Sequence, residues 1–363
     1  MSQAISNTTA VTLEEAKNLI ATCGADVTIM LQGGMGIGKS SLLWALAEQF
    51  NGTHDAVYMD MTTKDIADLS GVPYVEERNG IKVTHFAPNS ELKLHNKKPV
   101  ILMLDEFGKA MRPVQNTALR LMLERKMGED ALPAGSIVFG TTNKTGEGLG
   151  DNIQPHARNR LSFVTVKSPD AEQWCAWAVD NGVEAEVIAW VNQNPQALAS
   201  FDDGGQDENP YIFHPNKPMT AFCTPRSLTK ASHIIKHRGV LGTTATIAGV
   251  AGCVGEAAAR DMMAYAALAD KLPTWAEIVK HPDTAKLPAD GDAAASFITV
   301  YSALARVDKG SFDAWMVYCK RMAKEFQAVF CLNAVKSQAR TAALANRSFT
   351  TWATENHWLF DAK

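Results

Sequence analysis

The stretch Gly33-Gly-Met-Gly-Ile-Gly-Lys-Ser40 decides the fold of this chain. It fits the pattern G-x-x-x-x-G-K-[ST] in full, after a short apolar run at 27–31 and before the amphipathic stretch 39–49. In this pattern the glycines let backbone N–H groups point at phosphate oxygens, and the following helix offers its positive end to the same anion. Lys39 can reach the β- and γ-phosphates of a nucleotide, and the Ser40 hydroxyl can ligate Mg²⁺. The predicted nucleotide-binding residues are Gly33, Gly34, Met35, Gly36, Ile37, Gly38, Lys39, Ser40 and Ser41.

A second motif places two carboxylates at the end of a buried strand. Residues 100–104 (VILML) form a continuous apolar run, typical of a strand buried on both faces, and Asp105 and Glu106 follow it. Ligands bind outside the carboxyl ends of the strands in open α/β sheets. Asp105 is therefore predicted to hold Mg²⁺, directly or through water, and Glu106 to orient and deprotonate an attacking water. A single carboxylate at a strand end is common, so the two motifs are more specific together than either is alone.

Short apolar runs alternate with helical patterns through the first half of the chain. Strands are predicted at 27–31, 56–61, 100–104, 137–141 and 161–166, and helices at 12–23, 39–49 and 113–125. Such alternation predicts an α/β fold in which helices cover both faces of a parallel sheet. The segment 74–84 (YVEERNGIKVT) interrupts the pattern, because its Asn79-Gly80 pair predicts a β-hairpin.

The second half of the chain is predicted to be helical. Ser168-Pro169 has the pattern of an N-cap followed by proline in the first helical turn. Helical patterns follow at 169–180, 184–192, 226–237, about 244–270 and from 293 onward, and the segment 202–218, rich in Gly, Pro, Asp and Asn, is predicted to be a long loop.

The composition argues against several other classes of protein. The chain has 363 residues, of which 46% are hydrophobic and 20% charged, a balance that favours a globular fold over disorder. No apolar run approaches the length of a transmembrane helix, and the N-terminus lacks a signal-peptide pattern. The six cysteines form no CxxC pair, which disfavours a disulfide framework or zinc ribbon. We therefore expect a cytoplasmic protein without a membrane partner, and the net charge of −4 gives no support to nucleic-acid binding.

The chain resembles the AAA+ ATPases, and within them the MoxR-like group, over roughly residues 12–270. Five motifs occur in the family's order: GGMGIGKS at 33–40, VILMLDE at 100–106, VFGTTN at 138–143, HARNRL at 156–161 and TPRS at 224–227. The resemblance implies a P-loop αβα domain followed by an α-helical lid, with ATP and Mg²⁺ as cofactors and self-association into a ring, usually a hexamer. It suggests an ATPase core at 1–167, a lid at 168–271 and a C-terminal helical region at 272–363.

The resemblance also assigns roles to three later motifs. Asn143 matches the residue, sensor 1, that helps to place the attacking water, although an asparagine also commonly serves to turn the chain. Arg160 matches the arginine that reaches the γ-phosphate of the neighbouring subunit. The family often has Arg-Phe where this chain has Arg-Leu, so Arg158 is the alternative. Arg226 matches sensor 2, which contacts the γ-phosphate of its own subunit, and a surface arginine is the alternative there.

The expected hairpin at about 74–84 matches the place where the MoxR, McrB and dynein-like branch inserts a hairpin into its second helix. In rings of this kind the insert tends to face the pore or a partner. The mixed charges of this segment, Glu76, Glu77, Arg78 and Lys82, equally fit a solvated turn.

These observations predict an ATPase that hydrolyses ATP at subunit interfaces of a ring and thereby remodels or activates a partner protein. Relatives often act with a protein carrying a von Willebrand factor A domain, which makes such a protein the first candidate partner. The alternative is a nucleic-acid motor or loader of the McrB-like kind, which would need a basic surface. A nucleotide-gated assembly module with little turnover is a third possibility, and Glu106 with the two arginines argues against it.

Overall fold

The computed structural model describes residues 9–127, 130–143, 153–217 and 219–358. The chain divides into two compact units, Met1–Ser168 and Pro169–Lys363. The division of the second unit at residue 271 stays a prediction. Among the described residues, none of the helices combines the length and the apolarity needed to cross a bilayer.

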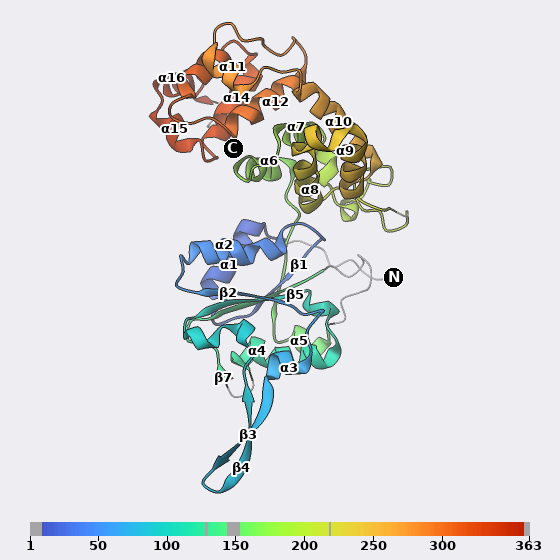
Figure 1. The fold of residues 1–363 in the computed structure, drawn as a ribbon, viewed down its shortest axis with the longest axis vertical. Coiled ribbons are helices and arrows are strands. Elements are labelled where there is room, and N and C mark those ends of the chain that lie inside the picture. The colour runs from blue at the N-terminus through green and yellow to red at the C-terminus, as the bar shows by residue number, and fades with distance from the viewer. Residues whose placement is uncertain (1–8, 128–129, 144–152, 218, 359–363) are drawn as a thin grey trace. The chain divides into compact units, whose positions relative to one another are not determined.

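The first unit is built on a parallel sheet of five strands in the order β2-β5-β8-β1-β9 (Figure 1). The predicted α/β class is therefore confirmed. Its strands are β1 (Ile29–Gln32), β2 (Asp55–Asp60), β5 (Val100–Asp105), β8 (Ile137–Thr142) and β9 (Ser162–Thr165). The short pair β6 (Lys126–Met127) and β7 (Asp130–Ala131) lies outside this sheet.

Helices cover both faces of the sheet, so its central strands are buried on both sides. On one face Ile101 and Met103 of β5 belong to a core that includes residues of α1 (Leu13–Cys23) and α2 (Leu42–Gln49). On the other face Leu102 and Leu104 belong to a core that includes residues of α3, α4 and α5. This alternation is why the apolar run of β5 has no polar positions. The three helices of the second face are α3 (Ile66–Ser70), α4 (Arg112–Glu124) and α5 (Pro155–Arg158).

The sequence predicts where the first two helices of this unit begin, and the structure agrees with the first of these predictions only. The Thr12 and Glu15 side chains form the reciprocal bonds of a capping box at the start of α1, as predicted. The expected continuous helix from Lys39 is wrong in its first turn, because a 3-10 helix at Lys39–Ser41 precedes α2. Gly38 before it has a left-handed backbone with φ of 107°, so the chain enters the helix from a tight bend.

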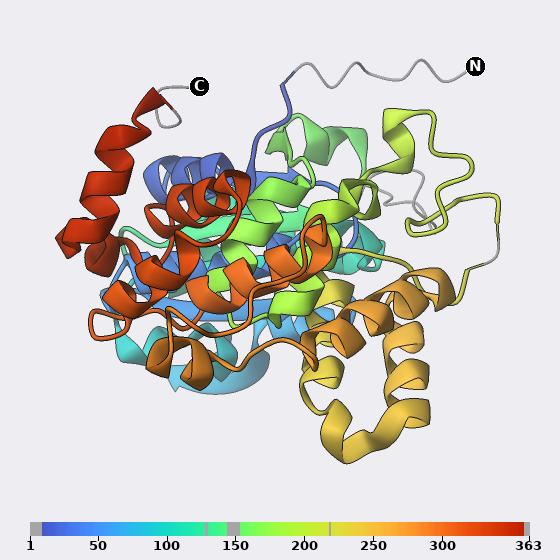
Figure 2. The same ribbon diagram turned by 90° about the horizontal axis from the view of Figure 1, so that it is seen from above.

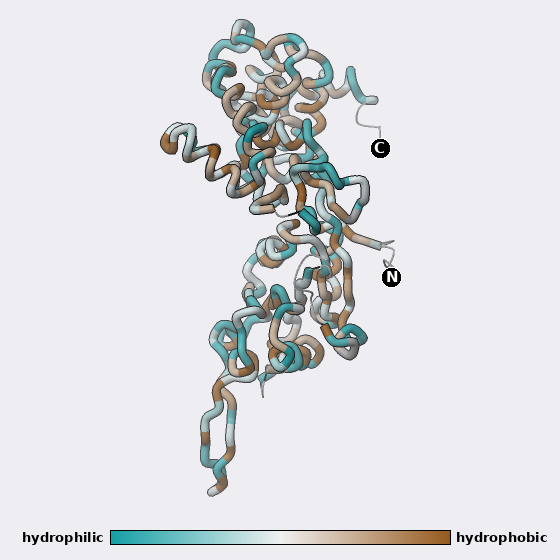
Figure 3. Tube along the Cα trace, turned by 90° about the vertical axis from the view of Figure 1, so that its right-hand side faces the viewer, coloured by the Kyte–Doolittle hydropathy of each residue, from teal (hydrophilic) through white to brown (hydrophobic). Residues whose placement is uncertain are grey.

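The predicted hairpin is present and longer than expected. Strands β3 (Val72–Arg78) and β4 (Ile81–Ala87) pair antiparallel around Asn79 and Gly80, whose φ angles are both positive, as a two-residue hairpin turn requires. Figure 1 shows the hairpin extending away from the sheet, and Figure 3 shows hydrophobic residues along both arms.

The second unit is helical and has one hydrophobic core, which runs from Trp174 to Trp352. The single helix expected at about 244–270 is wrong, because Gly255, with φ of 87°, separates α9 from α10. Figure 2 shows α8 and α9 as a helical hairpin whose connecting turn projects from the rest of this unit. The helices are α6 (Ala171–Asp180), α7 (Ala185–Gln193), α8 (Pro225–Lys236), α9 (Arg238–Val254), α10 (Glu256–Ala269), α11 (Trp275–Lys280), α12 (Ala293–Leu304), α13 (Phe312–Cys319), α14 (Lys324–Ala334), α15 (Arg340–Ala345) and α16 (Arg347–Glu355).

Candidate nucleotide-binding site

The glycine-rich loop leaves the carboxyl end of β1 and needs glycine for two separate reasons. Gly36 and Gly38 have φ angles of 71° and 107°, in the left-handed region that other residues rarely adopt. At Gly33 the reason is space, because a Cβ atom there would lie 2.7 Å from the carbonyl oxygen of Val166. Met35, Ile37 and Ser41 complete the loop, with Ile37 buried and Ser41 exposed.

The Lys39 side chain is turned back into this loop. Its Nζ atom donates to the carbonyl oxygens of Gly33 and Gly34, at 2.6 and 2.7 Å, and to Oδ1 of Asn143, at 3.2 Å. Only 7% of Lys39 is exposed. Asn143 directly follows β8, which pairs with β1. Two residues predicted from separate motifs are thus in direct contact at the carboxyl edge of the sheet.

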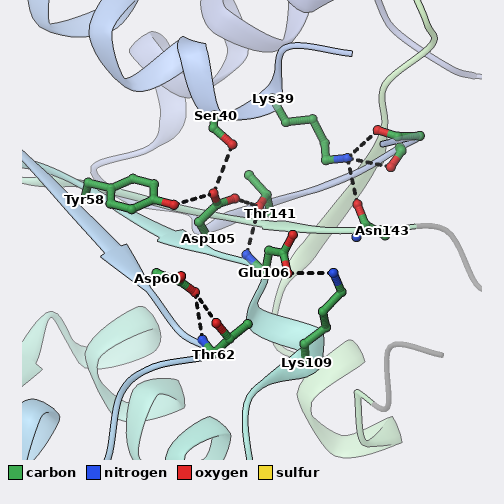
Figure 4. Close-up of polar contacts among 12 residues, drawn as sticks. Lys39, Ser40, Tyr58, Asp60, Thr62, Asp105, Glu106, Lys109, Thr141 and Asn143 are labelled. Atoms are coloured by element: carbon green, nitrogen blue, oxygen red, sulfur yellow. Dashed lines mark hydrogen bonds and ion pairs between the residues drawn. The ribbon is translucent and has the colours of Figure 1, made fainter. Parts of the chain in front are cut away.

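Three hydroxyl groups hold Asp105, the last residue of β5 (Figure 4). Ser40 Oγ and Tyr58 Oη donate to Oδ2 of Asp105, at 3.0 and 2.9 Å. Thr141 Oγ1 donates to Oδ1. Because Asp105 is only 7% exposed, these donors replace the water that would otherwise solvate its charge.

Glu106 occupies a different environment from its sequence neighbour. Strand β5 ends before Glu106, because the φ angle of Glu106 is 53°, outside the extended region. The Glu106 N–H donates to Thr141 Oγ1 at 3.1 Å. The carboxylate forms an ion pair with Lys109, at 2.6 Å, and 40% of the side chain is exposed. Asp105 is therefore fixed and buried, whereas Glu106 is accessible to water at the same edge of the sheet.

Tyr58, Thr141 and Lys109 are site residues that the sequence reasoning did not identify. Thr141 lies inside the quoted motif VFGTTN, two residues before Asn143, so its position was available as a signal. Tyr58 gave no such signal, because its contact depends on the pairing of β2 with β5, in which it lies opposite Met103. Partial desolvation of its hydroxyl, and then the hydrogen bond to Asp105, raise the pKa of Tyr58 above its ordinary range, so the hydroxyl keeps its proton.

The two candidate arginines of the HARNRL motif lie at the opposite edge of the sheet. They precede β9, whose first residue pairs with Ile29 at the start of β1, whereas the glycine-rich loop follows the end of β1. A four-residue strand spans about 13 Å, which separates the two edges. Arg158 stacks over the Phe163 ring, 5.2 Å from its centroid. Arg160 is exposed and lines an open groove of about 400 Å³ along α4 with Leu119, Arg120, Leu123 and others.

Arg226 belongs to the second unit. It is the second residue of α8, whose N-cap Thr224 forms a capping box with Ser227. Its side chain is exposed. The structure therefore places Arg226 at the start of a helix, as the sequence predicts, and its proposed contact with nucleotide stays a prediction.

The groups at the carboxyl edge suit a nucleotide with Mg²⁺. Ser40 and Asp105 offer adjacent oxygen atoms, the ligand type that Mg²⁺ prefers, and Mg²⁺ is usually held by one or two such groups together with phosphates. The Lys39 ammonium lies in the glycine-rich loop, where it would hold phosphate. The donor set therefore fits both predicted cofactors.

Comparisons with known proteins place no family on this chain. No family model matches it, and none of the curated proteins does. Three crystal structures of NtrX from Brucella abortus are similar to it, one of them in complex with ADP and one with ATP. They have 15–16% sequence identity, TM-scores of 0.33–0.34, and cover 95–97% of this chain and 68–69% of theirs. Such scores are too low to carry a fold or a function over to this chain.

Proposed function

We propose that this chain is a Mg²⁺-dependent AAA+ ATPase. The observation that carries the proposal is the hydrogen bond between Ser40 Oγ and Asp105 Oδ2, at 3.0 Å. It joins the phosphate-loop motif to the acidic motif, which are distant in sequence, and it places both at one edge of a parallel sheet. A chance match of either motif would not bring the metal-binding hydroxyl and carboxylate into contact.

In this proposal different residues of the carboxyl edge bind phosphate, hold the metal ion and activate water. Lys39 and the amides of the glycine-rich loop bind the phosphates, and Ser40 and Asp105 hold Mg²⁺, which neutralises phosphate charge when bound. Glu106, the accessible carboxylate, takes a proton from the attacking water, and Asn143 orients that water. Arg226 contacts the γ-phosphate of its own subunit, so that the position of its helix depends on the nucleotide state.

The arginines at the amino edge require a second copy of the chain. Arg160 cannot serve the site of its own sheet, because that site begins at the other end of the strands. An exposed arginine there can complete the site of a neighbouring subunit and stabilise transition-state charge. We favour Arg160 over Arg158, since Arg158 is already engaged by Phe163. Hydrolysis would then depend on assembly into a ring, with a hexamer as the expected form.

We further propose that the ATPase is MoxR-like and acts on a partner protein, with a von Willebrand factor A domain protein as the first candidate. The β3–β4 hairpin supports this subgroup by its place between β2 and β5. Its exposed apolar residues, among them Val72, Val75 and Ile81 at 64–66% exposure, suit a contact with another protein.

A nucleic-acid motor or loader is the second candidate, and one observation favours it. The exposed positions of α8 and its C-cap are all basic: Arg226, Lys230, His233, Lys236 and His237. No acidic residue occurs in 225–255, and none of these five side chains forms an ion pair with a described residue. Such a face matches the negative charge of a phosphate backbone. The proposed ATP site is the same whether the chain remodels a protein or moves along a nucleic acid.

One experiment tests the activity and separates the two candidates. The Glu106→Gln variant should bind ATP without hydrolysing it, and can be recovered from the native host with bound material, with and without nuclease treatment. Lys39→Ala, unable to bind nucleotide, is the matched control. A stoichiometric protein that survives nuclease and leaves when ATP is removed supports the remodelling function. Recovery dominated by nuclease-sensitive DNA or RNA favours the motor, and wild-type hydrolysis by Glu106→Gln contradicts the assigned base.

A further inference from the structure

We propose that Tyr58 is a positioning residue that competes with the hydrated Mg²⁺ ion for Asp105 and thereby weakens metal binding. The inference rests on the proposed function, in that it takes Asp105 as the carboxylate of the metal site. Tyr58 comes from β2, which is the edge strand of the sheet, and no motif of the sequence includes it.

The acceptor capacity of Asp105 is nearly filled in this structure. A carboxylate has about four lone-pair positions, two on each oxygen. Ser40 and Tyr58 use both positions of Oδ2, and Thr141 uses one of Oδ1. The oxygen that faces the metal-binding hydroxyl of Ser40 is therefore already fully engaged.

Mg²⁺ dehydrates reluctantly and keeps several of its waters, which donate hydrogen bonds to nearby carboxylates. A hydrated ion bound beside Ser40 needs a free acceptor on the same side of Asp105. Since Oδ2 has none, one of its two donors has to leave. Ser40 is itself a ligand of the ion, so the donor that leaves is Tyr58.

The position of Tyr58 allows this exchange. Its side chain is 45% exposed, whereas Asp105 is 7% and Lys39 is 7% exposed. Because β2 has a neighbouring strand on only one side, the ring can turn toward solvent without disturbing a second strand. Thr141, by contrast, is 1% exposed and keeps the carboxylate oriented through Oδ1 when Tyr58 departs.

Tyr58→Phe tests the competition because it keeps the ring and removes only the donor. The metal-free state loses a hydrogen bond to a charged group, and the metal-bound state loses nothing. The Mg²⁺ concentration at half-saturation should therefore fall by about tenfold to 100-fold, the equivalent of one hydrogen bond to a charged group. The affinity for nucleotide without Mg²⁺ should stay at the wild-type value.

The measurement is a Mg²⁺ titration of the full chain, followed by binding of a fluorescent, non-hydrolysable ATP analogue. Tyr74→Phe on the hairpin is the matched control, since the Tyr74 hydroxyl makes no hydrogen bond to a described residue, and its titration should be unchanged. The Mg²⁺ dependence of ATP hydrolysis is a second readout and should shift in the same direction.

Asp105→Asn in the same titration separates this inference from the proposed function. If Asp105→Asn raises the Mg²⁺ midpoint and Tyr58→Phe lowers it, the competition is supported. If Asp105→Asn raises the midpoint while Tyr58→Phe leaves it unchanged or raises it, the competition is wrong and the metal site stands. If Asp105→Asn leaves the Mg²⁺ midpoint unchanged, the metal site and the competition are both wrong.

Discussion

The two edges of the parallel sheet carry different kinds of charged residue. At the carboxyl edge two pairs of side chains are hydrogen-bonded within one chain. Lys39 donates to Asn143, and Ser40 donates to Asp105. At the amino edge, Arg160 is exposed and lies one strand length from that site. Under the proposed function, one subunit would contain the groups that bind and place a nucleotide, while Arg160 would serve only the site of a neighbour. Binding is therefore expected to be a property of the single subunit, and hydrolysis a property of the assembly.

The largest effect is expected from Lys39→Ala, which removes the buried cation of the carboxyl edge. Loss of a buried, charged contact to phosphate should weaken ATP binding by about 100-fold or more. Equilibrium binding of a fluorescent ATP analogue measures this change. Lys17→Ala, which removes a surface partner of Glu14, should bind as the wild type does. Wild-type affinity of Lys39→Ala would mean that the loop does not bind phosphate.

Arg160→Ala should remove the catalytic contribution of the amino edge without affecting ATP binding. ATP affinity should stay at the wild-type value, while the turnover rate falls by about 10³-fold, the lower range for an arginine finger. Arg120→Ala, on the same flank of α4 and paired with Glu124, controls for loss of surface charge. Full activity of Arg160→Ala together with loss in Arg158→Ala would move the finger role to Arg158.

Glu106→Gln should lower turnover by about 10²- to 10³-fold, the range for a lost general base. The variant keeps the shape of the side chain, and Asp105 still holds the metal, so ATP binding should be retained. Single-turnover hydrolysis and equilibrium binding, measured on the same sample, separate the two effects. A parallel loss of binding would place Glu106 among the metal-binding groups instead.

The smallest effect is expected from Lys109→Met. The Lys109–Glu106 ion pair is 37% and 40% exposed, and pairs of this kind contribute little, so releasing Glu106 should raise turnover by about twofold to fivefold. The steady-state rate at saturating ATP measures it, with Lys17→Ala again as the control. A fall in turnover would show that Lys109 assists catalysis rather than restraining the base.

The sequence predicts much of the first unit because its motifs are local. The glycine-rich loop, the strand ending in Asp105 and the Asn79-Gly80 turn each depend on a few adjacent residues, and each forms as predicted. The contacts of Tyr58 and Thr141 with Asp105 depend instead on strand order and register, since β2 and β8 flank β5. Neither order nor register is encoded in a single motif, so these residues were not identified.

The second unit was predicted less completely for a related physical reason. The helical patterns locate α6, α7 and α8 well. A capping box begins α6 and α8, and α7 is buried along most of its length without a side-chain cap. The stretch from 238 to 269 is apolar or neutral over most of its length, and periodicity alone does not reveal the break at Gly255. A helix tolerates an isolated glycine, so the sequence does not show which glycines of this stretch interrupt it. In the structure Gly242 and Gly255 both have non-helical backbone angles, with φ of 72° and 87°.

Mixing two inactive variants tests most directly whether Glu106 of one subunit acts together with Arg160 of its neighbour. Glu106→Gln has an intact Arg160, and Arg160→Ala has an intact Glu106, so a ring containing both restores complete sites at some interfaces. If Arg160 acts between subunits, the mixture should hydrolyse ATP at up to roughly a quarter of the wild-type rate, because random assembly completes about one interface in four. Glu106→Gln mixed with the double variant Glu106→Gln/Arg160→Ala should remain inactive. No recovery in a mixture shown to co-assemble would contradict an arginine acting between subunits.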